Sequence, residues 1–291
     1  MKLRTRRRTI EFTARPLIMG IVNLVADSFS GDGIENPERA LDHARQLVRD
    51  GADIVDIGAE SAGTQRAVMS EAEESARLRG FMQKFLPSDI GETLLSINTW
   101  RPAVARAALA MGGDILNDIG ALPTDENARL CAEHGVALLL MHSVGEPKIP
   151  HTHVHYGDVM DTLEDFFMQK ILLAEKAGVP REALILDPGI DFAKQRADNL
   201  RIFRALSRLQ KFARPILLPV SRKTVIGEVL NIRAPRERDA GTIACIVSGM
   251  RRGAVIFRVH NVRAAAQTIS LLAAIEENQA PTMRRESLNK R

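Results

Sequence analysis

Aromatic residues, cysteines and long apolar runs are all scarce in this sequence. Aromatic residues make up 4% of the 291 residues, with one Trp and one Tyr. A nucleic-acid surface needs basic side chains interleaved with aromatic ones, and the sequence has no such pattern. No apolar stretch reaches the roughly 18 residues that suggest a membrane-spanning helix. We therefore expect neither a nucleic-acid partner nor a membrane partner.

The two cysteines, Cys131 and Cys245, each lie in an apolar helical pattern and lack the spacing of metal ligands. Buried, reduced thiols fit this usage. The basic N-terminal residues are followed by "TIEFTARP" and not by an apolar run, so we expect no secretory signal there. The net charge of +4 is a weak bias, and much of it lies near the two ends of the chain. These features together predict a cytoplasmic protein with solvated ends.

Eight short apolar runs alternate with amphipathic stretches. The runs are continuous, which is typical of strands buried on both faces. An open doubly wound sheet would share this pattern, but eight strand–helix units in a chain of this length favour an α/β fold of the closed (β/α)8 TIM barrel type. We expect one domain, a barrel over residues 16–277, after a strand or hairpin in residues 1–15 and before a disordered tail at 278–291. The predicted strands are 17–22, 53–58, 94–97, 114–117, 137–142, 183–187, 216–221 and 254–259, and predicted helices include 37–50, 101–112, 125–135, 158–178 and 263–276.

Every predicted strand delivers polar residues at its C-terminal end. In a barrel of this type these ends meet at one rim, where the active site lies. Each desolvated polar group costs free energy unless it is paired, so eight converging sets indicate a ligand. In chain order the strand ends carry Asn23, Asp27 and Ser28; Glu60 and Ser61; Asn98 and Thr99; Asn117 and Asp118; His142; Asp187; Ser221, Arg222 and Lys223; and Arg258 and His260.

The chemistry of these residues limits the class of ligand that the rim can bind. Basic side chains gather after the seventh and eighth predicted strands, where barrels often bind phosphate. Asn117, Asp187 and Lys223 suit a flat heterocycle with several N–H and C=O edges. The rim therefore fits a heteroaromatic ring with an anionic, phosphorylated arm. The alternative is a rim of salt bridges without a ligand, for example Asp187 with Lys223, since charge networks also occur in inert proteins.

Seven segments resemble the dihydropteroate synthase family, in family order and at family spacing, between about residues 16 and 276. The first loop, "IMGIVNLVADSFSGDG" (18–33), is similar to that family's I-M-G-I-L-N and T-P-D-S-F-S-D-G-G. Any single short motif would be weak evidence, but the ordered set is specific. The other matching segments are "GADIVDIGAES" (51–61), "LNDI" (116–119), "LMHS" (140–143), "LDPGIDFAK" (186–194), "SRKTVIG" (221–227) and "RVHNV" (258–262).

The resemblance implies a transferase of folate biosynthesis. Such an enzyme condenses 6-hydroxymethyl-7,8-dihydropterin diphosphate with 4-aminobenzoate, forming a C–N bond and releasing diphosphate. It uses Mg²⁺, and barrels of this family often form homodimers through their later helices. The resemblance implies catalytic roles for Asp27, Lys223 and Arg258, substrate binding by Asn98, Asn117, Asp187, Phe192, Ser221, Arg222, Lys223, Arg258 and His260, and Mg²⁺ ligation by Asn23.

The sequence departs from the family pattern at several positions. Ala26 replaces a proline in the first loop, and Gly63 stands where the second loop usually has an arginine. Arg66, three residues on, is a candidate to reach the same place. Asn98 replaces an aspartate at the end of the third strand, and Asn261 replaces another in "RVHNV". A carboxylate at 98 would stabilise a developing pterin cation, so its loss should slow a dissociative reaction.

Two interpretations remain open on the sequence alone. One is a working synthase with divergent loops and altered discrimination between 4-aminobenzoate and sulfonamide analogues. The other is a paralogue that binds a pterin without running the condensation, as the related barrel of cobalamin-dependent methyltransferases also binds a pterin. A pure interaction protein would not need Asn117, Asp187, Lys223 and Arg258 together.

Overall fold

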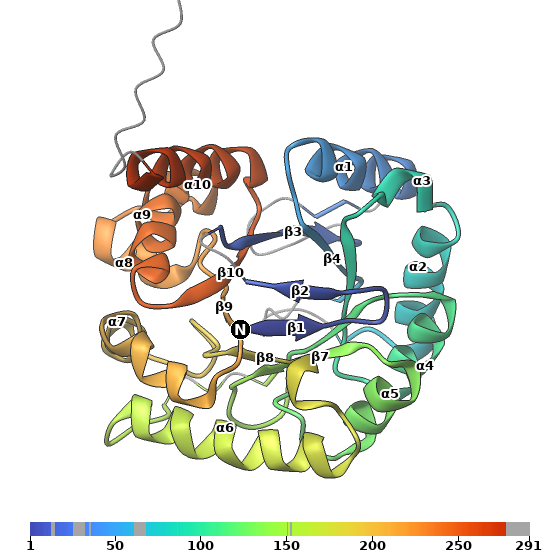
Figure 1. Cartoon of the computed structure of the whole chain (residues 1–291), viewed down its shortest axis with the longest axis horizontal. Helices are drawn as coiled ribbons and strands as arrows, with labels where there is room; N and C mark the ends of the chain where they lie inside the picture. The colour runs from blue at the N-terminus through green and yellow to red at the C-terminus, as the bar shows by residue number, and fades with distance from the viewer. Residues whose placement is uncertain are drawn as a thin grey trace, which may run out of the picture.

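Eight parallel strands close into a barrel in the computed structural model, and each strand hydrogen-bonds to its neighbours in chain order (Figure 1). The last strand pairs with the first, which closes the ring. This confirms the predicted (β/α)8 barrel. The structure describes residues 1–12, 15–25, 33–34, 36–60, 68–85, 87–149, 151 and 153–277. The barrel strands are β3 (Leu17–Asn23), β4 (Ile54–Gly58), β5 (Leu94–Asn98), β6 (Ile115–Asp118), β7 (Ala137–Met141), β8 (Leu184–Asp187), β9 (Ile216–Leu218) and β10 (Ala254–Val259).

The helices surround the barrel (Figure 1). The five helices whose ranges the sequence predicts lie within two residues of the predicted bounds. No helix of the described residues is both long and apolar enough to span a bilayer. In chain order the helices are α1 (Pro37–Arg49), α2 (Glu71–Met82), α3 (Pro87–Ile90), α4 (Pro102–Met111), α5 (Glu126–His134), α6 (Val159–Lys176), α7 (Arg196–Ala205), α8 (Thr224–Leu230), α9 (Asp239–Met250) and α10 (Val262–Glu277), with 3-10 turns η1 (Arg181–Ala183), η2 (Leu206–Phe212) and η3 (Pro235–Arg238).

Helix α1 illustrates how local sequence sets an element and its packing. The Asn36 side chain accepts hydrogen bonds from the N–H groups of Glu38 and Arg39, and Pro37 occupies the first turn, where its missing N–H costs nothing. The apolar face of α1 includes Leu47, which packs over Gly20 of β3. A Cβ atom at Gly20 would lie 3.1 Å from the Leu47 Cδ1 atom, so a larger residue would push the helix off the barrel.

Strand β9 is three residues shorter than predicted. It ends at Leu218, whereas the apolar run continues to Ser221. Pro219 has no N–H group to donate to a neighbouring strand, so the ladder stops before it. The residues Ser221, Arg222 and Lys223 consequently lie in the turn between β9 and α8, where Arg222 has a positive φ of 58°.

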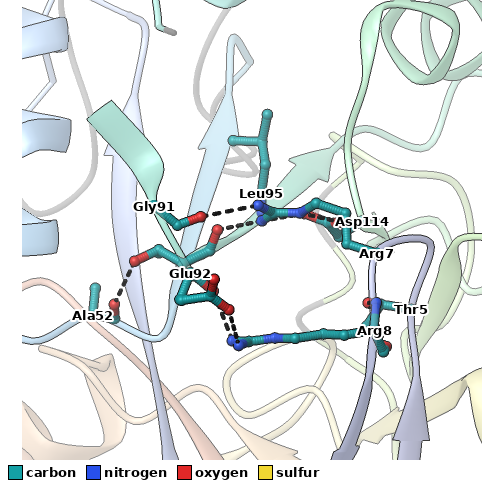
Figure 2. Close-up of polar contacts among 9 residues, drawn as sticks. Thr5, Arg7, Arg8, Ala52, Gly91, Glu92, Leu95 and Asp114 are labelled. Atoms are coloured by element: carbon teal, nitrogen blue, oxygen red, sulfur yellow. Dashed lines mark hydrogen bonds and ion pairs between the residues drawn. The ribbon is translucent and has the colours of Figure 1, made fainter. Parts of the chain in front are cut away.

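An antiparallel hairpin of β1 (Lys2–Arg4) and β2 (Thr9–Glu11) lies across the N-terminal end of the barrel. Its turn residue Arg7 forms a bidentate ion pair with the buried carboxylate of Asp114, at the start of β6, with distances of 2.9 and 3.0 Å from Nε (Figure 2). The same guanidinium donates to the carbonyl oxygens of Gly91 and Thr93, which precede β5. The hairpin is therefore bonded to the strands whose N-terminal ends it covers. The division into hairpin, barrel and tail stays a prediction, and residues 278–291 lie outside the described residues.

We expect Arg7→Ala to lower the free energy of unfolding by about 2 kcal/mol, because the Asp114 carboxylate would lose its charged donor while buried. The matched control is Arg8→Ala. Arg8 also forms an ion pair from the hairpin, but the Glu92 side chain that it contacts is 92% exposed, so the loss should be much smaller. Urea denaturation of the two variants measures the difference, and equal losses would show that the hairpin is not held through Asp114.

Candidate active site

A buried carboxylate, Asp56 of β4, organises the C-terminal half of the barrel interior. It accepts hydrogen bonds from Ser96 Oγ at 2.6 Å, from Asn117 Nδ2 at 3.2 Å and from Asn98 Nδ2 at 3.4 Å. It also pairs with Arg258 Nε of β10 at 2.8 Å. The Asp56 side chain has no exposed surface. All four partners are donors, so one carboxylate orients side chains from β5, β6 and β10.

Asn98 and Asn117 each have an amide oxygen in this part of the barrel interior. Their Oδ1 atoms are buried and lack a hydrogen bond within the part of the chain that the structure describes. The amide orientation is determined, because the Nδ2 groups must face the Asp56 carboxylate. Leaving buried acceptors unpaired costs free energy, so a ligand with N–H donors would stabilise this arrangement.

Asp187 ends β8 and faces the same interior. Its Oδ1 atom accepts the N–H of Gly189 at 2.7 Å, and the residue is 3% exposed. Burial raises the pKa of Asp187 to about 6, although the Gly189 N–H and the charges of Lys223, Lys194 and Arg258 act in the opposite direction. The end of β8 thus offers oxygen acceptors to a ligand, in addition to those of β5 and β6.

Lys223 is held by the loop after β8. Its Nζ donates to the Ile190 carbonyl oxygen at 2.8 Å and lies 4.7 Å from the centre of the Phe192 ring. Burial lowers the pKa of Lys223, while the Asp191 and Asp187 carboxylates oppose the shift. Lys223 Nζ therefore contacts a carbonyl oxygen and an aromatic ring. These contacts differ from the Asp187–Lys223 salt bridge that a rim without a ligand would favour.

Ser221 and His260 form a second polar pair on adjacent strand ends. Ser221 Oγ accepts the His260 main-chain N–H at 3.0 Å and lies 2.7 Å from His260 Nδ1. The serine hydroxyl has one proton, and Nδ1 is the acceptor within its reach. This arrangement favours the His260 tautomer that carries its proton on Nε2.

Arg222 pairs with a carboxylate from α9. Its Nε and Nη2 atoms lie 2.8 and 3.2 Å from the two oxygens of Asp239. Asn261 Nδ2 donates to the same carboxylate at 3.0 Å. Asn261 thus helps to hold the Asp239 carboxylate beside Arg222. Arg222, which is predicted to face an anionic substrate, already pairs with the anionic side chain of Asp239.

Asn23 ends β3, and its carbonyl oxygen accepts the N–H of Ile34 at 3.0 Å. Its position at the rim is as predicted. Asp27, Gly63 and Arg66 lie outside the described residues, so the structure does not test their predicted places. The remaining predicted site residues lie on or directly after strands β5, β6, β8, β9 and β10.

Asp56 is not among the predicted site residues. The sequence signal for it is a carboxylate in the middle of an otherwise apolar strand, because a buried strand tolerates a charge only when the charge is paired. Glu60 had no predicted role, and Arg101 was not among the candidate residues. Arg101 Nη1 bonds the carboxylates of Glu60 and Glu74, and its Nη2 donates to the Met69 carbonyl oxygen at 3.1 Å. This ion cluster ties the residues before α2 to the start of α4.

Comparison with known proteins shows the family to which this barrel belongs. A family model described as pterin binding enzyme matches residues 19–260. The chain is 35% identical over 275 residues to a dihydropteroate synthase of Bacillus subtilis, covering 94% of this chain and 93% of that protein. These matches identify a pterin-binding barrel enzyme.

Solved structures narrow the assignment. A dihydropteroate synthase of Yersinia pestis, solved with a sulfonamide drug, superposes with a TM-score of 0.87 at 32% identity, covering 96% of this chain and 100% of that one. The enzyme of Xanthomonas albilineans in complex with 7,8-dihydropteroate gives a TM-score of 0.82 at 33% identity, covering 95% and 99%. The chain belongs to the dihydropteroate synthase family. The predicted family, enzyme class and function in folate biosynthesis are confirmed, and nothing in the comparisons favours the impaired paralogue.

We expect Asp56→Asn to destabilise the protein by about 3 kcal/mol, because the new amide N–H group would face donors and Arg258 would lose its charge partner. Pterin affinity should fall as well, since Asn98 and Asn117 would lose the group that orients them. The matched control is Asp53→Asn, three residues earlier, whose carboxylate pairs with the half-exposed Arg15 at 2.9 Å. Denaturation and calorimetric titration with a pterin check both effects. Unchanged pterin affinity in Asp56→Asn would contradict the orienting role.

Proposed function

We propose that the chain joins 6-hydroxymethyl-7,8-dihydropterin diphosphate to 4-aminobenzoate at this rim, with the residue roles given below. The observation that carries these roles is the pair of buried amide oxygens of Asn98 and Asn117, which have no hydrogen bond among the described residues and which Asp56 orients towards the position of a ligand. The pterin edge is rich in N–H donors and is the part of the substrate that suits them.

Residues of β5, β6 and β8 and of the turn after β9 would hydrogen-bond the pterin ring. Asn117 and Asn98 accept its N–H groups, Asp187 accepts at a further N–H edge, and Lys223 donates to its carbonyl oxygen or a ring nitrogen. Burial strengthens each of these hydrogen bonds and penalises a ring that lacks the matching groups. The Phe192 ring, in contact with Lys223, forms the apolar boundary towards the second substrate.

The diphosphate arm would lie against Arg258 and His260. The Arg258 Nε is directed to Asp56, which holds the guanidinium so that its other N–H groups can donate to phosphate oxygens. His260, with the tautomer favoured by Ser221, can donate from Nε2. These donors stabilise charge as it develops on the leaving group, so they lower the barrier for breaking the C–O bond.

The condensation exchanges one bond for another. The amine nitrogen of 4-aminobenzoate bonds to the methylene carbon of the pterin, the bond from that carbon to the diphosphate oxygen breaks, and the nitrogen loses a proton. Ser221 and Arg222 are proposed on the side of the aminobenzoate carboxylate. Because Asp239 already pairs with Arg222, the incoming carboxylate must share or displace that partner, which moderates its affinity.

Asn23 is the proposed protein ligand of Mg²⁺. Its side-chain amide oxygen is a ligand type that Mg²⁺ accepts, and Mg²⁺ sites usually combine one or two protein ligands with substrate phosphates and water. Among the described residues, no group of three or more His, Cys, Asp or Glu side chains could hold a metal by itself. The side-chain oxygen of Asn23 fits a Mg²⁺ ion that also binds the diphosphate of the substrate, and the bound ion would supply positive charge to the leaving group. Asp27 completes the proposed catalytic set with Lys223 and Arg258.

A cytoplasmic homodimer is also part of this proposal. Helix α10 exposes Leu271 at 63% and Ile275 at 60%, and α6 exposes Met168 at 59%. Apolar side chains on the outer helices are suited to a contact between two barrels. Light scattering of the purified protein measures the mass, and a monomer at all accessible concentrations would contradict this part of the proposal.

The decisive experiment measures diphosphate release from the pterin diphosphate with Mg²⁺, with and without 4-aminobenzoate, and detects the product by mass spectrometry. We expect release that depends on aminobenzoate, with dihydropteroate as the product. Calorimetry of pterin binding runs in parallel as a test of folding and of the site. Tight pterin binding without turnover would favour the binding paralogue and exclude the proposed reaction.

Pterin binding should weaken in acid. Protonation removes the charge of the Asp187 carboxylate and turns one of its acceptor oxygens into an O–H donor, which weakens its bonds to the pterin N–H groups, and its pKa is raised to about 6. The affinity should therefore be constant above this pH and fall by about tenfold per pH unit below it, until the pKa of the complex is reached. Titrations with 6-hydroxymethyl-7,8-dihydropterin between pH 4.5 and 8 measure this dependence. The Asp187→Asn variant should bind the pterin weakly, and its affinity should not fall further below pH 6. If the affinity of this variant still falls in acid as in the wild type, a group other than Asp187 causes the pH dependence.

A further inference from the structure

The loop between β8 and α7 carries a second buried lysine that the proposed reaction does not use. Lys194 is 8% exposed, and its Nζ lies 2.8 Å from His142 Nδ1, 3.0 Å from the Phe192 carbonyl oxygen and 3.4 Å from the His142 carbonyl oxygen. His142 directly follows β7 and is 2% exposed. One buried amino group thus connects the end of one strand to the loop that follows the next strand.

The number of acceptors matches an ammonium group. A lysine ammonium has three N–H donors, and Lys194 has three acceptors within reach. Burial lowers the pKa of His142 to about 3, and the nearby Lys194 charge adds to this effect, so the imidazole is neutral and can offer the Nδ1 lone pair. The Phe166 ring meets the His142 ring edge-on at 4.9 Å, which restricts its rotation.

The loop is tightly placed against this pair. Gly189 has a φ of 66°, and a Cβ atom there would lie 1.9 Å from the His142 carbonyl oxygen and 3.3 Å from Lys194 Nζ. Two lysines bond carbonyl oxygens of this loop: Lys223 Nζ donates to that of Ile190, and Lys194 Nζ donates to that of Phe192. Residues 189–193 are therefore fixed by Lys223, which belongs to the proposed pterin site, and by Lys194.

We propose that Lys194 is a positioning residue for the aminobenzoate side of the site: its buried amino group holds the Phe192 main chain against the end of β7 and so places the Phe192 ring. This inference rests on the proposed function for the identity of the second substrate. The clamp itself rests only on the contacts of Lys194.

The charges around Lys194 make this clamp sensitive to pH. Burial lowers the pKa of Lys194 to about 7, opposed by Asp187, Asp198 and Asp191, while the Lys223 charge adds to the decrease. Below that pH the ammonium donates three hydrogen bonds. Above it the neutral amine has two N–H groups, so one of the three contacts weakens and the loop is held less firmly.

The test compares Lys194→Met with Lys170→Met. Lys170 is a half-buried lysine of α6 that donates to one main-chain oxygen, that of Leu122, at 2.7 Å, so both variants lose one charge and a bond to the backbone. We expect Lys194→Met to raise the KM for 4-aminobenzoate by about tenfold, the usual effect of losing a charged hydrogen bond, and to leave the KM for the pterin diphosphate within about twofold. Lys170→Met should change neither KM.

Two further measurements separate positioning from general stability. Lys194→Gln keeps two N–H donors without charge, so it should give a smaller rise in the aminobenzoate KM and remove the change in that KM near pH 7. Hydrogen exchange of the amides in residues 189–193 should be faster in Lys194→Met than in Lys170→Met, and this readout does not require turnover.

The outcomes are distinguishable. An unchanged aminobenzoate KM in both Lys194 variants, or an equal rise of both KM values, would overturn the positioning role. If the wild-type protein makes no dihydropteroate, the proposed function fails, and exchange in residues 189–193 then decides whether the clamp exists. Exchange that is equal in Lys194→Met and Lys170→Met would refute the clamp.

Discussion

The pairing of the Asp56 carboxylate inside the barrel is the interaction on which the site depends. A charge on a central strand has no water to solvate it, so its neighbours must be donors. Ser96, Asn98, Asn117 and Arg258 meet that requirement, and three of these four also belong to the proposed substrate site. The requirement to satisfy one buried anion therefore determines which atoms the barrel presents to a pterin. The same side chains thus satisfy the buried charge and form the proposed binding site.

The departures from the family pattern acquire a physical meaning in this arrangement. Asn98 donates to Asp56, whereas a carboxylate at 98 would face Asp56 and repel it. Asn98 thus avoids the repulsion that two carboxylates would have in the free protein. In exchange, the site has one negative charge fewer beside the proposed pterin ring. At a different part of the rim, after β10, Asn261 supports Asp239 in pairing with Arg222. Both asparagines hydrogen-bond a nearby carboxylate, so the local balance of charge is maintained by different residues.

Much of the fold could be predicted from the sequence, because continuous apolar runs and amphipathic stretches report burial directly. The helix over 37–49 and the strand over 254–259 agree with their predicted ranges within a residue. Polar residues at strand ends also located the rim. The pattern could not show partners that come from distant segments, such as Asp239 for Arg222 or His142 for Lys194. It also missed the early end of β9, where Pro219 interrupts the ladder, since proline fits the apolar composition of the run.

The ion pair between Arg7 and Asp114 spans 107 residues of sequence, and this separation bears on how the chain matures. During synthesis from the N-terminus, the hairpin leaves the ribosome long before β6, so its anchoring point does not yet exist. The hairpin can reach this anchoring point only after about two fifths of the chain, 114 of 291 residues, has emerged. The first residues made thus wait for their native contact, and until then the partly made barrel exposes the N-terminal ends of its strands.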